Sequence, residues 1–306
     1  MTEMRVVAAG LRFPEGPVWM KDGSVILVEI ERGTITLVAA DGAVSVLAET
    51  GGGPNGLAIG LDGAIYVCNN GGFRWVTEGG YLRPVGPPPD YRGGRIERVD
   101  PATGDTRVLY DRCGDYRLNG PNDIVFDTEG GFYFTDLGKS RERDRDHGAV
   151  YYATADGKRI VEVAFPLFTP NGIGLSPDGR ELYVAETETA RLWAFDITAP
   201  GTVRKHGFPS PHGGRLVHGI AGLVRFDSLA VDAAGNICVA TLLTGCISVI
   251  APGGGLVRQV DTGDPFTTNI CFGGPDLRTG YVTLSGRGEL VAIPWPEPGL
   301  PLAFEV

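Results

Sequence analysis

A unit that recurs six times constrains the fold of this chain more than any other feature. Each copy begins with a polar residue, continues as a short apolar run, and has a turn pair seven and eight residues after its first residue. The copies begin at Glu15, Asn55, Asn122, Asn171, Asp227 and Asn269. Their turn pairs are Asp22-Gly23, Asp62-Gly63, Glu129-Gly130, Asp178-Gly179, Ala234-Gly235 and Asp276-Leu277. An Asp-Gly pair between two apolar runs is a strong local signal of a β-hairpin.

A second pair of apolar runs follows each hairpin, for example "GTITLV" (33–38) and "AVSVLAE" (43–49) in the first copy. No apolar pattern of helical period extends over twelve residues, so the sequence predicts an all-β protein. Six units of four antiparallel strands predict one six-bladed β-propeller domain over residues 1–306. A β-sandwich is the alternative, but six matches at one spacing disfavour it. The segment "MRVVAAG" (4–10) is predicted to supply the outer strand of the last blade.

Composition excludes several classes of partner. The net charge of −10 and a pI near 4.9 leave no basic stripe for a nucleic acid. No apolar run approaches the length of a membrane span, and the N-terminal residues lack the apolar core of a signal peptide. Five cysteines without a C-x-x-C spacing predict free thiols in a reducing compartment. We therefore expect a cytoplasmic protein with neither a nucleic-acid nor a membrane partner.

The first residues of the six copies predict a polar ring. In a propeller the first strand of each blade lines the central channel, so these residues should lie together at one mouth of it. All six carry side-chain oxygen. Turn chemistry explains an Asn before Gly, and for Asn55 that explanation is equally good, but it does not require Glu15 and Asp227. Converging carboxylates and amides repel one another unless a cation lies between them, and hard divalent cations prefer such oxygens.

The third copy, "PNDIVFD" (121–127), is the only one with a charged residue in second place, Asp123. This carboxylate could tune a metal site, contact substrate or cap a loop. The long connections 70–93, 112–121, 137–147 and 207–226 all fall on the mouth side of the predicted strands, which indicates a substrate pocket with a lid. Candidate lining residues are Arg74, Trp75, Tyr81, Tyr91, Arg117, His147 and His218.

Other catalytic systems fit poorly. The chain has no G-x-S-x-G motif, and "GGGPNG" (51–56) lacks the Lys-Ser/Thr pair of a phosphate-binding loop. Of the four histidines, His206, His212 and His218 lie on a glycine-rich segment and read as loop residues rather than as metal ligands.

Four motifs together resemble the SMP-30/gluconolactonase/luciferin-regenerating family, which includes diisopropyl fluorophosphatase. The motifs are "FPEGPVW" (13–19), "PNDIVFD" (121–127), "TPNGIGLSPDGRELYVAET" (169–187) and "TNICFGGPDLRTGYVT" (268–283). The resemblance implies a six-bladed propeller with one catalytic divalent metal ion in the channel. Its ligands would be Glu15, Asn171 and Asp227, with Asn122 a ligand or a substrate contact. Calcium is the first choice of metal, with zinc, manganese, magnesium and iron(II) as alternatives.

The resemblance implies a metal-dependent hydrolase of a small lactone, sugar-type or related, acting in carbohydrate metabolism, with Asp227 as general base. Asp123 and Glu186 are alternative bases. The expected substrate contacts are Asn55, Trp75, Arg117, Asn122, Asp123 and Asn269.

Two departures from the family pattern border the site: Phe226-Asp227-Ser228 stands in place of Pro-Asp-Gly, and Gly120 stands where an arginine is common. These departures disfavour a simple aldonolactone as substrate and do not bear on lactone hydrolysis itself. The rival functions are hydrolysis of a phosphotriester or another ester at the same site, and a binding propeller without enzymatic activity.

Overall fold

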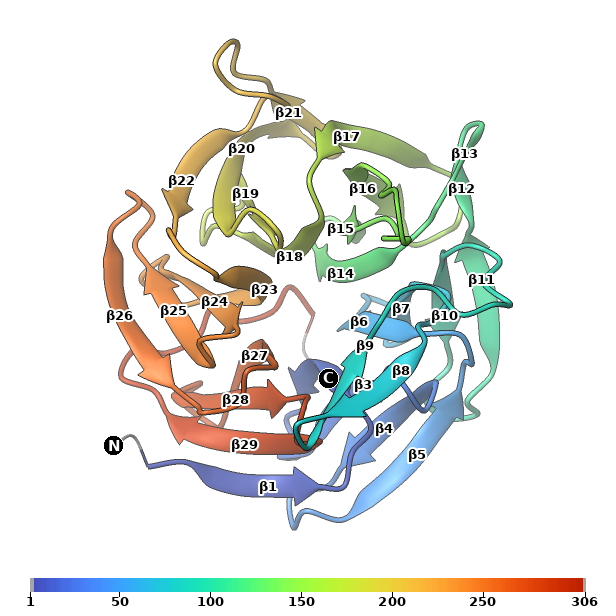
Figure 1. The fold of residues 1–306 in the computed structure, drawn as a ribbon, viewed down its shortest axis with the longest axis vertical. Coiled ribbons are helices and arrows are strands. Elements are labelled where there is room, and N and C mark those ends of the chain that lie inside the picture. Colours follow the sequence, from blue (N-terminus) through green and yellow to red (C-terminus); the bar gives the residue numbers. More distant parts are fainter. Residues whose placement is uncertain (1–2, 305–306) are drawn as a thin grey trace.

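The computed structural model describes residues 3–304, and this part of the chain contains β-strands and no α-helix. Six antiparallel sheets are arranged around a central channel as the blades of a propeller (Figure 1). The predicted all-β, six-bladed architecture is therefore confirmed. No helix in residues 3–304 has the length and apolar character needed to cross a bilayer.

Each blade is built from the channel outward in chain order. The innermost strands are β2 (Pro14–Trp19), β6 (Pro54–Ile59), β14 (Pro121–Phe126), β18 (Pro170–Leu175), β23 (Arg225–Val231) and β27 (Thr267–Gly273). The second strands are β3 (Val25–Glu29), β7 (Ile65–Asn69), β15 (Gly131–Asp136), β19 (Glu181–Glu186), β24 (Ile237–Leu242) and β28 (Thr279–Leu284). The third strands are β4 (Thr34–Val38), β10 (Arg95–Val99), β16 (Gly148–Thr154), β20 (Arg191–Ala199), β25 (Cys246–Ile250) and β29 (Glu289–Pro294). We number the blades one to six from β2.

The outermost strands lie at the rim of the propeller. They are β5 (Val44–Glu49), β11 (Thr106–Tyr110), β17 (Ile160–Leu167), β21 (Thr202–Arg204) with β22 (Arg215–Gly219), β26 (Leu256–Asp261) and β1 (Arg5–Ala9). Strand β1 pairs with β29, from Arg5 opposite Ala292 to Ala9 opposite Glu289, so the N-terminal segment completes the sixth blade as predicted. The fourth blade departs from the four-strand pattern, because β21 and β22 both pair with β20.

The apolar core is divided among the interfaces between neighbouring blades. Buried side chains form a cluster at each of the six interfaces within residues 3–304. Between the second and third blades, for example, the Tyr66 ring lies 5.0 Å from Phe126 and 5.7 Å from Phe132, measured between centroids. Because each blade buries both of its faces in this way, the strands read as nearly continuous apolar runs.

Several long connections contain strands of their own. The segment 70–93 includes the hairpin β8 (Trp75–Glu78) and β9 (Tyr81–Pro84), which crosses in front of the first blade in Figure 1. The segment 112–121 includes the short hairpin β12 (Arg112–Cys113) and β13 (Tyr116–Arg117), which projects from the outer edge of the propeller. All five cysteines lie in the described part of the chain and are free.

Candidate active site at the channel mouth

A β-bulge beside the mouth residue recurs in every blade. The pairing of the first and second strands shifts register between Glu15 and Val18, Pro54 and Gly56, Pro121 and Ile124, Pro170 and Ile173, Phe226 and Leu229, and Thr267 and Asn269. A bulge bends the strand and redirects the side chain at that point. The six first residues of the repeats therefore occupy equivalent places where the innermost strands begin.

The innermost strands also approach one another very closely beside these residues. A Cβ atom added to Gly172 would lie 2.6 Å from the Asp227 carbonyl oxygen and 2.8 Å from the Leu229 nitrogen. Added to Gly56, it would lie 2.5 Å from the Asn122 carbonyl oxygen. Glycine is thus required at positions 56 and 172 because the backbone of the next blade occupies the space of a side chain there.

Two carboxylate–amide pairs join neighbouring blades across the mouth. The Asn269 side-chain amide donates to Glu15 Oε2 at 2.7 Å, and the Gly16 backbone N–H donates to the same oxygen at 2.6 Å. The Asn171 side-chain amide donates to Asp227 Oδ1 in a short hydrogen bond and to Thr187 Oγ1 at 3.1 Å. Glu15, Asn171 and Asn269 are buried and Asp227 is partly exposed.

Asp123 adds a third buried carboxylate to the site. Its Oδ1 accepts from the Ile124 N–H at 3.1 Å, and its own N–H donates to Thr135 Oγ1 at 3.1 Å. Thr135 in turn donates to the Asn171 carbonyl oxygen at 2.6 Å, which ties the third blade to the fourth. Asp123 occupies the place that glycine fills in the first, second and fourth blades.

Burial and mutual repulsion make these carboxylates hard to ionise. Burial raises the pKa of Glu15 to about 7. Burial, and next the charge of Glu15, raise the pKa of Asp123 to about 8. The same two causes raise the pKa of Asp227 well above its ordinary value, and the charge of Asp123 adds to them. Like charges that raise one another's pKa in a desolvated site indicate a place for a cation.

The donor set fits a hard divalent cation that accepts mixed oxygen ligands. Residues 3–304 contain no group of three or more His, Cys, Asp or Glu side chains arranged for a metal ion, so amide oxygens would have to complete the ligand set. Amides are available: the side chains of Asn55 and Asn122 are buried and form no hydrogen bond to another described residue. Carboxylates combined with amide oxygens are ligands for calcium or magnesium rather than for a soft metal.

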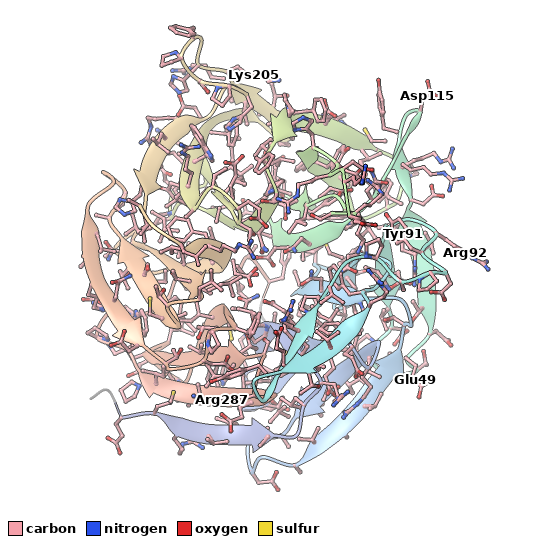
Figure 2. The ribbon with its side chains drawn as sticks, in the orientation of Figure 1. Glu49, Tyr91, Arg92, Asp115, Lys205 and Arg287 are labelled. Atoms are coloured by element: carbon pink, nitrogen blue, oxygen red, sulfur yellow. The ribbon has the colours of Figure 1, made fainter. Side chains whose placement is uncertain are left out.

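The remaining predicted site residues are not all near this group. Trp75 lies beside the mouth, because its ring packs 5.0 Å from that of Phe13, two residues before Glu15. Arg117 is exposed on β13, and Asp115 at the tip of the same hairpin lies at the outer edge of the molecule in Figure 2. The structure therefore does not bring Arg117 to the channel mouth.

Glu186 belongs to a second polar set that the sequence analysis did not identify. Glu29, Asn69, Asp136 and Glu186 end the second strands of the first four blades. Each accepts a backbone hydrogen bond from the segment leading to the mouth residue: from Arg12 at 2.6 Å, Gly53 at 2.9 Å, Asn119 at 2.7 Å and Phe168 at 2.7 Å, respectively. The signal was present in the repeats, since each of these strands ends in an acid or an amide. Glu186 is thus engaged in holding the backbone.

A cavity of about 790 Å³ fills the channel on the side of Asp123 opposite the mouth. Its inner end is formed by Gly16, Asp123 and Asn269, and its walls are mostly apolar side chains of the innermost strands. Residues 300–304 line its outer end, where the Phe304 ring packs 5.7 Å from Phe126. The long connections predicted a pocket on the mouth side, and this cavity shows that the channel also has open space on the hairpin side.

Comparison with known proteins places this arrangement among relatives. The gluconolactonase of Zymomonas mobilis is 28% identical over 89% of this chain and 76% of its own length. A lactonase, drp35, of Staphylococcus saprophyticus is 30% identical over 80% of this chain and 68% of its own length. The structure of regucalcin, a calcium-binding protein from Agrobacterium tumefaciens, matches with a TM-score of 0.75 and 19% identity over 98% of both chains, which supports the fold.

The family model of the SMP-30/gluconolactonase/LRE-like region matches residues 13–286, a span that runs from the segment before Glu15 to beyond Asn269. All six mouth residues lie inside this match. The chain therefore belongs to the SMP-30/gluconolactonase/LRE-like family.

Proposed function

We propose that this protein hydrolyses a small lactone at the channel mouth with the help of one divalent cation. The observation that carries the proposal is the two carboxylate–amide pairs, Glu15 with Asn269 and Asp227 with Asn171, in a desolvated site where the charge of Glu15 opposes that of Asp227. The relatives named for gluconolactone and lactone hydrolysis support the substrate class.

Glu15, Asn171 and Asp227 would hold the ion, with Asn122 as a further ligand or a substrate contact. When bound, a divalent cation polarises a carbonyl oxygen and lowers the pKa of a nearby water. Calcium is the first choice because the donors are hard oxygens. The calcium-binding neighbour regucalcin agrees with this choice but shares only the fold.

Asp227 is the proposed general base. Asn171 fixes its Oδ1, and Oδ2 has no hydrogen-bond partner in residues 3–304, so this oxygen can accept a proton. Asp227 takes the proton of a water whose oxygen bonds to the lactone carbonyl carbon. The ring C–O bond then breaks, and the leaving alkoxide takes that proton to give the open-chain hydroxy acid.

Substrate contacts are proposed for the amides of Asn55 and Asn122, for Asn269 and Asp123, and for Trp75 on the β8–β9 hairpin. The two free amides provide donors for the carbonyl or for ring hydroxyl groups. Asp123 is an alternative base, because it is a second carboxylate whose pKa is raised by burial and by the charge of Glu15.

The deciding experiment measures hydrolysis of lactones and of phosphotriesters by the purified protein, first stripped by a chelator and then supplied separately with Ca²⁺, Zn²⁺, Mn²⁺, Mg²⁺ and Fe²⁺. We expect lactone hydrolysis that requires the added ion. Removal of the general base in Asp227→Asn should lower kcat on the order of 10²- to 10⁴-fold. Asp276→Asn, at the exposed turn of the sixth repeat, is the matched control and should leave kcat unchanged. Full activity after chelation, or in Asp227→Asn, would refute the proposal, and preference for phosphotriesters would replace its substrate class.

A further inference from the structure

A lysine lies buried where the second and third blades meet above the channel. Lys139, in the connection after β15, has 2% of its side chain surface exposed. Its Nζ donates to the Gly72 carbonyl oxygen at 2.9 Å and to Asn70 Oδ1 at 3.1 Å. The same atom lies 4.0 Å from the centroid of the Phe73 ring and 5.2 Å from that of Tyr91.

This lysine has no carboxylate partner within residues 3–304 at ion-pair distance. Burial lowers the pKa of Lys139 to about 7, although the charges of Asp136 and Asp146 act in the opposite direction. The site also contains an unsatisfied group, since the buried Asn70 Nδ2 has no hydrogen-bond partner. A buried amine and an orphaned amide cost stability, so their presence requires a reason other than the stability of the fold.

On the side of the second blade, Lys139 is connected through Asn70 to the backbone that leads to Asn55. The Asn70 N–H donates to the Gly53 carbonyl oxygen at 2.8 Å, and Gly53 lies two residues before Asn55. A Cβ added to Gly53 would lie 2.6 Å from Asn70 Oδ1 and 2.7 Å from Gly72. The turn at Asn70 and Gly72, which Lys139 holds, is therefore in direct contact with the backbone that leads to Asn55.

On the side of the third blade, Tyr91 connects Lys139 to the backbone that leads to Asn122. The Tyr91 hydroxyl, whose ring covers Lys139, donates to the Asn119 carbonyl oxygen at 2.5 Å. In Figure 2 Tyr91 lies inward of Arg92, which is at the periphery. The Leu137 N–H donates to the Gly120 carbonyl oxygen at 2.9 Å, so the segment carrying Lys139 is itself attached before Asn122.

We propose that Lys139 is a positioning residue that sets the two neighbouring mouth amides, Asn55 and Asn122, and anchors the start of the segment 70–93 that carries the β8–β9 hairpin. The proposal rests on the proposed function in one respect, namely that these two amides contact the lactone. Lys139 itself touches no reacting atom, because its amine is enclosed by Asn70, Gly72, Phe73 and Tyr91.

Hydrogen exchange of the purified, metal-supplied protein tests the positioning without relying on activity. Lys139→Met keeps a straight side chain of similar length but removes both hydrogen bonds. We expect faster exchange in residues 69–73 and 118–122 and unchanged exchange in the fifth and sixth blades. Lys158→Met, at an exposed lysine paired with Asp156, is the matched control and should change neither segment.

Kinetics with the best lactone of the panel test the consequence for function. A displacement of substrate-binding groups by about 1 Å can cost about a hundredfold, so Lys139→Met should lower kcat/KM by about tenfold to a hundredfold. Most of this loss should appear in KM. Tyr91→Phe, which removes only the hydroxyl bond to Asn119, should produce a smaller loss and faster exchange confined to residues 118–122.

The outcomes separate this inference from the lactonase proposal. If the wild-type protein hydrolyses no lactone, the proposed function fails, and the exchange experiment alone decides whether Lys139 couples the two segments. Normal exchange and normal kcat/KM in Lys139→Met would overturn the inference. So would faster exchange spread over all six blades, because that result describes a general loss of stability. If Lys139→Met does not fold, Tyr91→Phe with its localised change keeps the test decisive.

Discussion

Gly172 shows how little room the channel wall leaves beside a mouth residue. A methyl group there would meet backbone atoms of Asp227 and Leu229, and strand pairing holds Phe226 and Leu229 on either side. We predict that Gly172→Ala destabilises the protein by about 1–3 kcal/mol. It should also disturb the Asn171–Asp227 hydrogen bond. Chemical denaturation measures the free energy of unfolding, and Gly255→Ala, where the added methyl meets open space, is the control. Equal stability of the two variants would contradict the packing described for the innermost strands.

Glu15 allows the charge at the mouth to be removed with little change of shape. In Glu15→Gln the side chain keeps an oxygen that can accept from Asn269 and Gly16. We expect metal affinity to fall by a factor of ten or more, roughly the cost of one lost charged ligand. The thermal midpoint of the metal-free variant should be no lower than that of the wild type. Isothermal titration with Ca²⁺ measures the affinity, with the exposed Glu142→Gln as control. Unchanged affinity would remove Glu15 from the ligand set.

For individual residues, the sequence predicted the place in the fold better than the chemical role. Glu15, Asn171, Asp227 and Asn269 were predicted to lie at one mouth, and the structure pairs Asn269 with Glu15 and Asn171 with Asp227. Glu186 was an alternative base because it is also an acid at the mouth end of a strand. Its actual partners are the Phe168 backbone, Thr189 and Trp193. The repeat pattern predicted the strand that contains Trp193, but it does not specify loop geometry or which side chains pair.

Strand β1 is the element on which closure of the ring depends. It covers the edge of β29, and its Ala8 packs with Leu11, Val25, Leu27 and Leu290 between the sixth and first blades. Deletion of residues 1–9 should therefore lower the thermal midpoint and expose β29 to edge-to-edge association. Calorimetry and light scattering measure the two effects. Val6→Thr, which alters an exposed side chain but keeps the strand pairing, should have neither. A monomeric truncated protein of full stability would show that closure does not require β1.

The elements themselves were predictable because the repeat fixes both strand length and turn position. The six bulges were not predicted, since an extra residue in one strand leaves no separate signal beside a polar residue and a glycine. The connections were recognised by length and side, but their internal pairing was missed. Strand β22, for instance, pairs with β20 within what read as an open loop, because exposed strands of five residues carry a weak pattern.

On the scale of the whole molecule, the mouth concentrates negative charge that the fold must tolerate. Folding raises the pKa of Glu15 from 4.5 to about 7 and that of Asp123 from 3.8 to about 8. Between about pH 4 and pH 8 the folded, metal-free protein therefore binds more protons than the unfolded chain does. Its free energy of unfolding should fall as pH rises through this window, because the unfolded state is then favoured.

Thermal unfolding at pH 5, 6.5 and 8 tests this expectation in chelator and in Ca²⁺. The midpoint should fall with pH in chelator, and added Ca²⁺ should restore it most strongly at pH 8, where the carboxylates are free to bind the ion. Glu15→Gln should show a weaker pH dependence in chelator. A midpoint that rises with pH in the chelated protein would show that other groups dominate the linkage.

The whole architecture could be predicted because six similar units leave few arrangements in which each unit buries both faces. The site could be predicted only in part. The ring of oxygen-bearing residues follows from the repeats, whereas the burial of Lys139 and the outward projection of Arg117 depend on how two unrelated connections fold. Their residues carry no periodicity from which such contacts could be derived.

The Glu15–Asn269 hydrogen bond has a consequence for the synthesis of the protein. Its two partners are separated by 254 positions in the chain. The ribosome makes Glu15 254 residues before Asn269, so the amide that will donate a hydrogen bond to this carboxylate does not yet exist when Glu15 is made. A domain generally folds as a unit, and this carboxylate remains in an incomplete ring of blades until the sixth blade, with Asn269, has been made. The mouth of the channel is therefore among the last parts of this propeller that can take their final form.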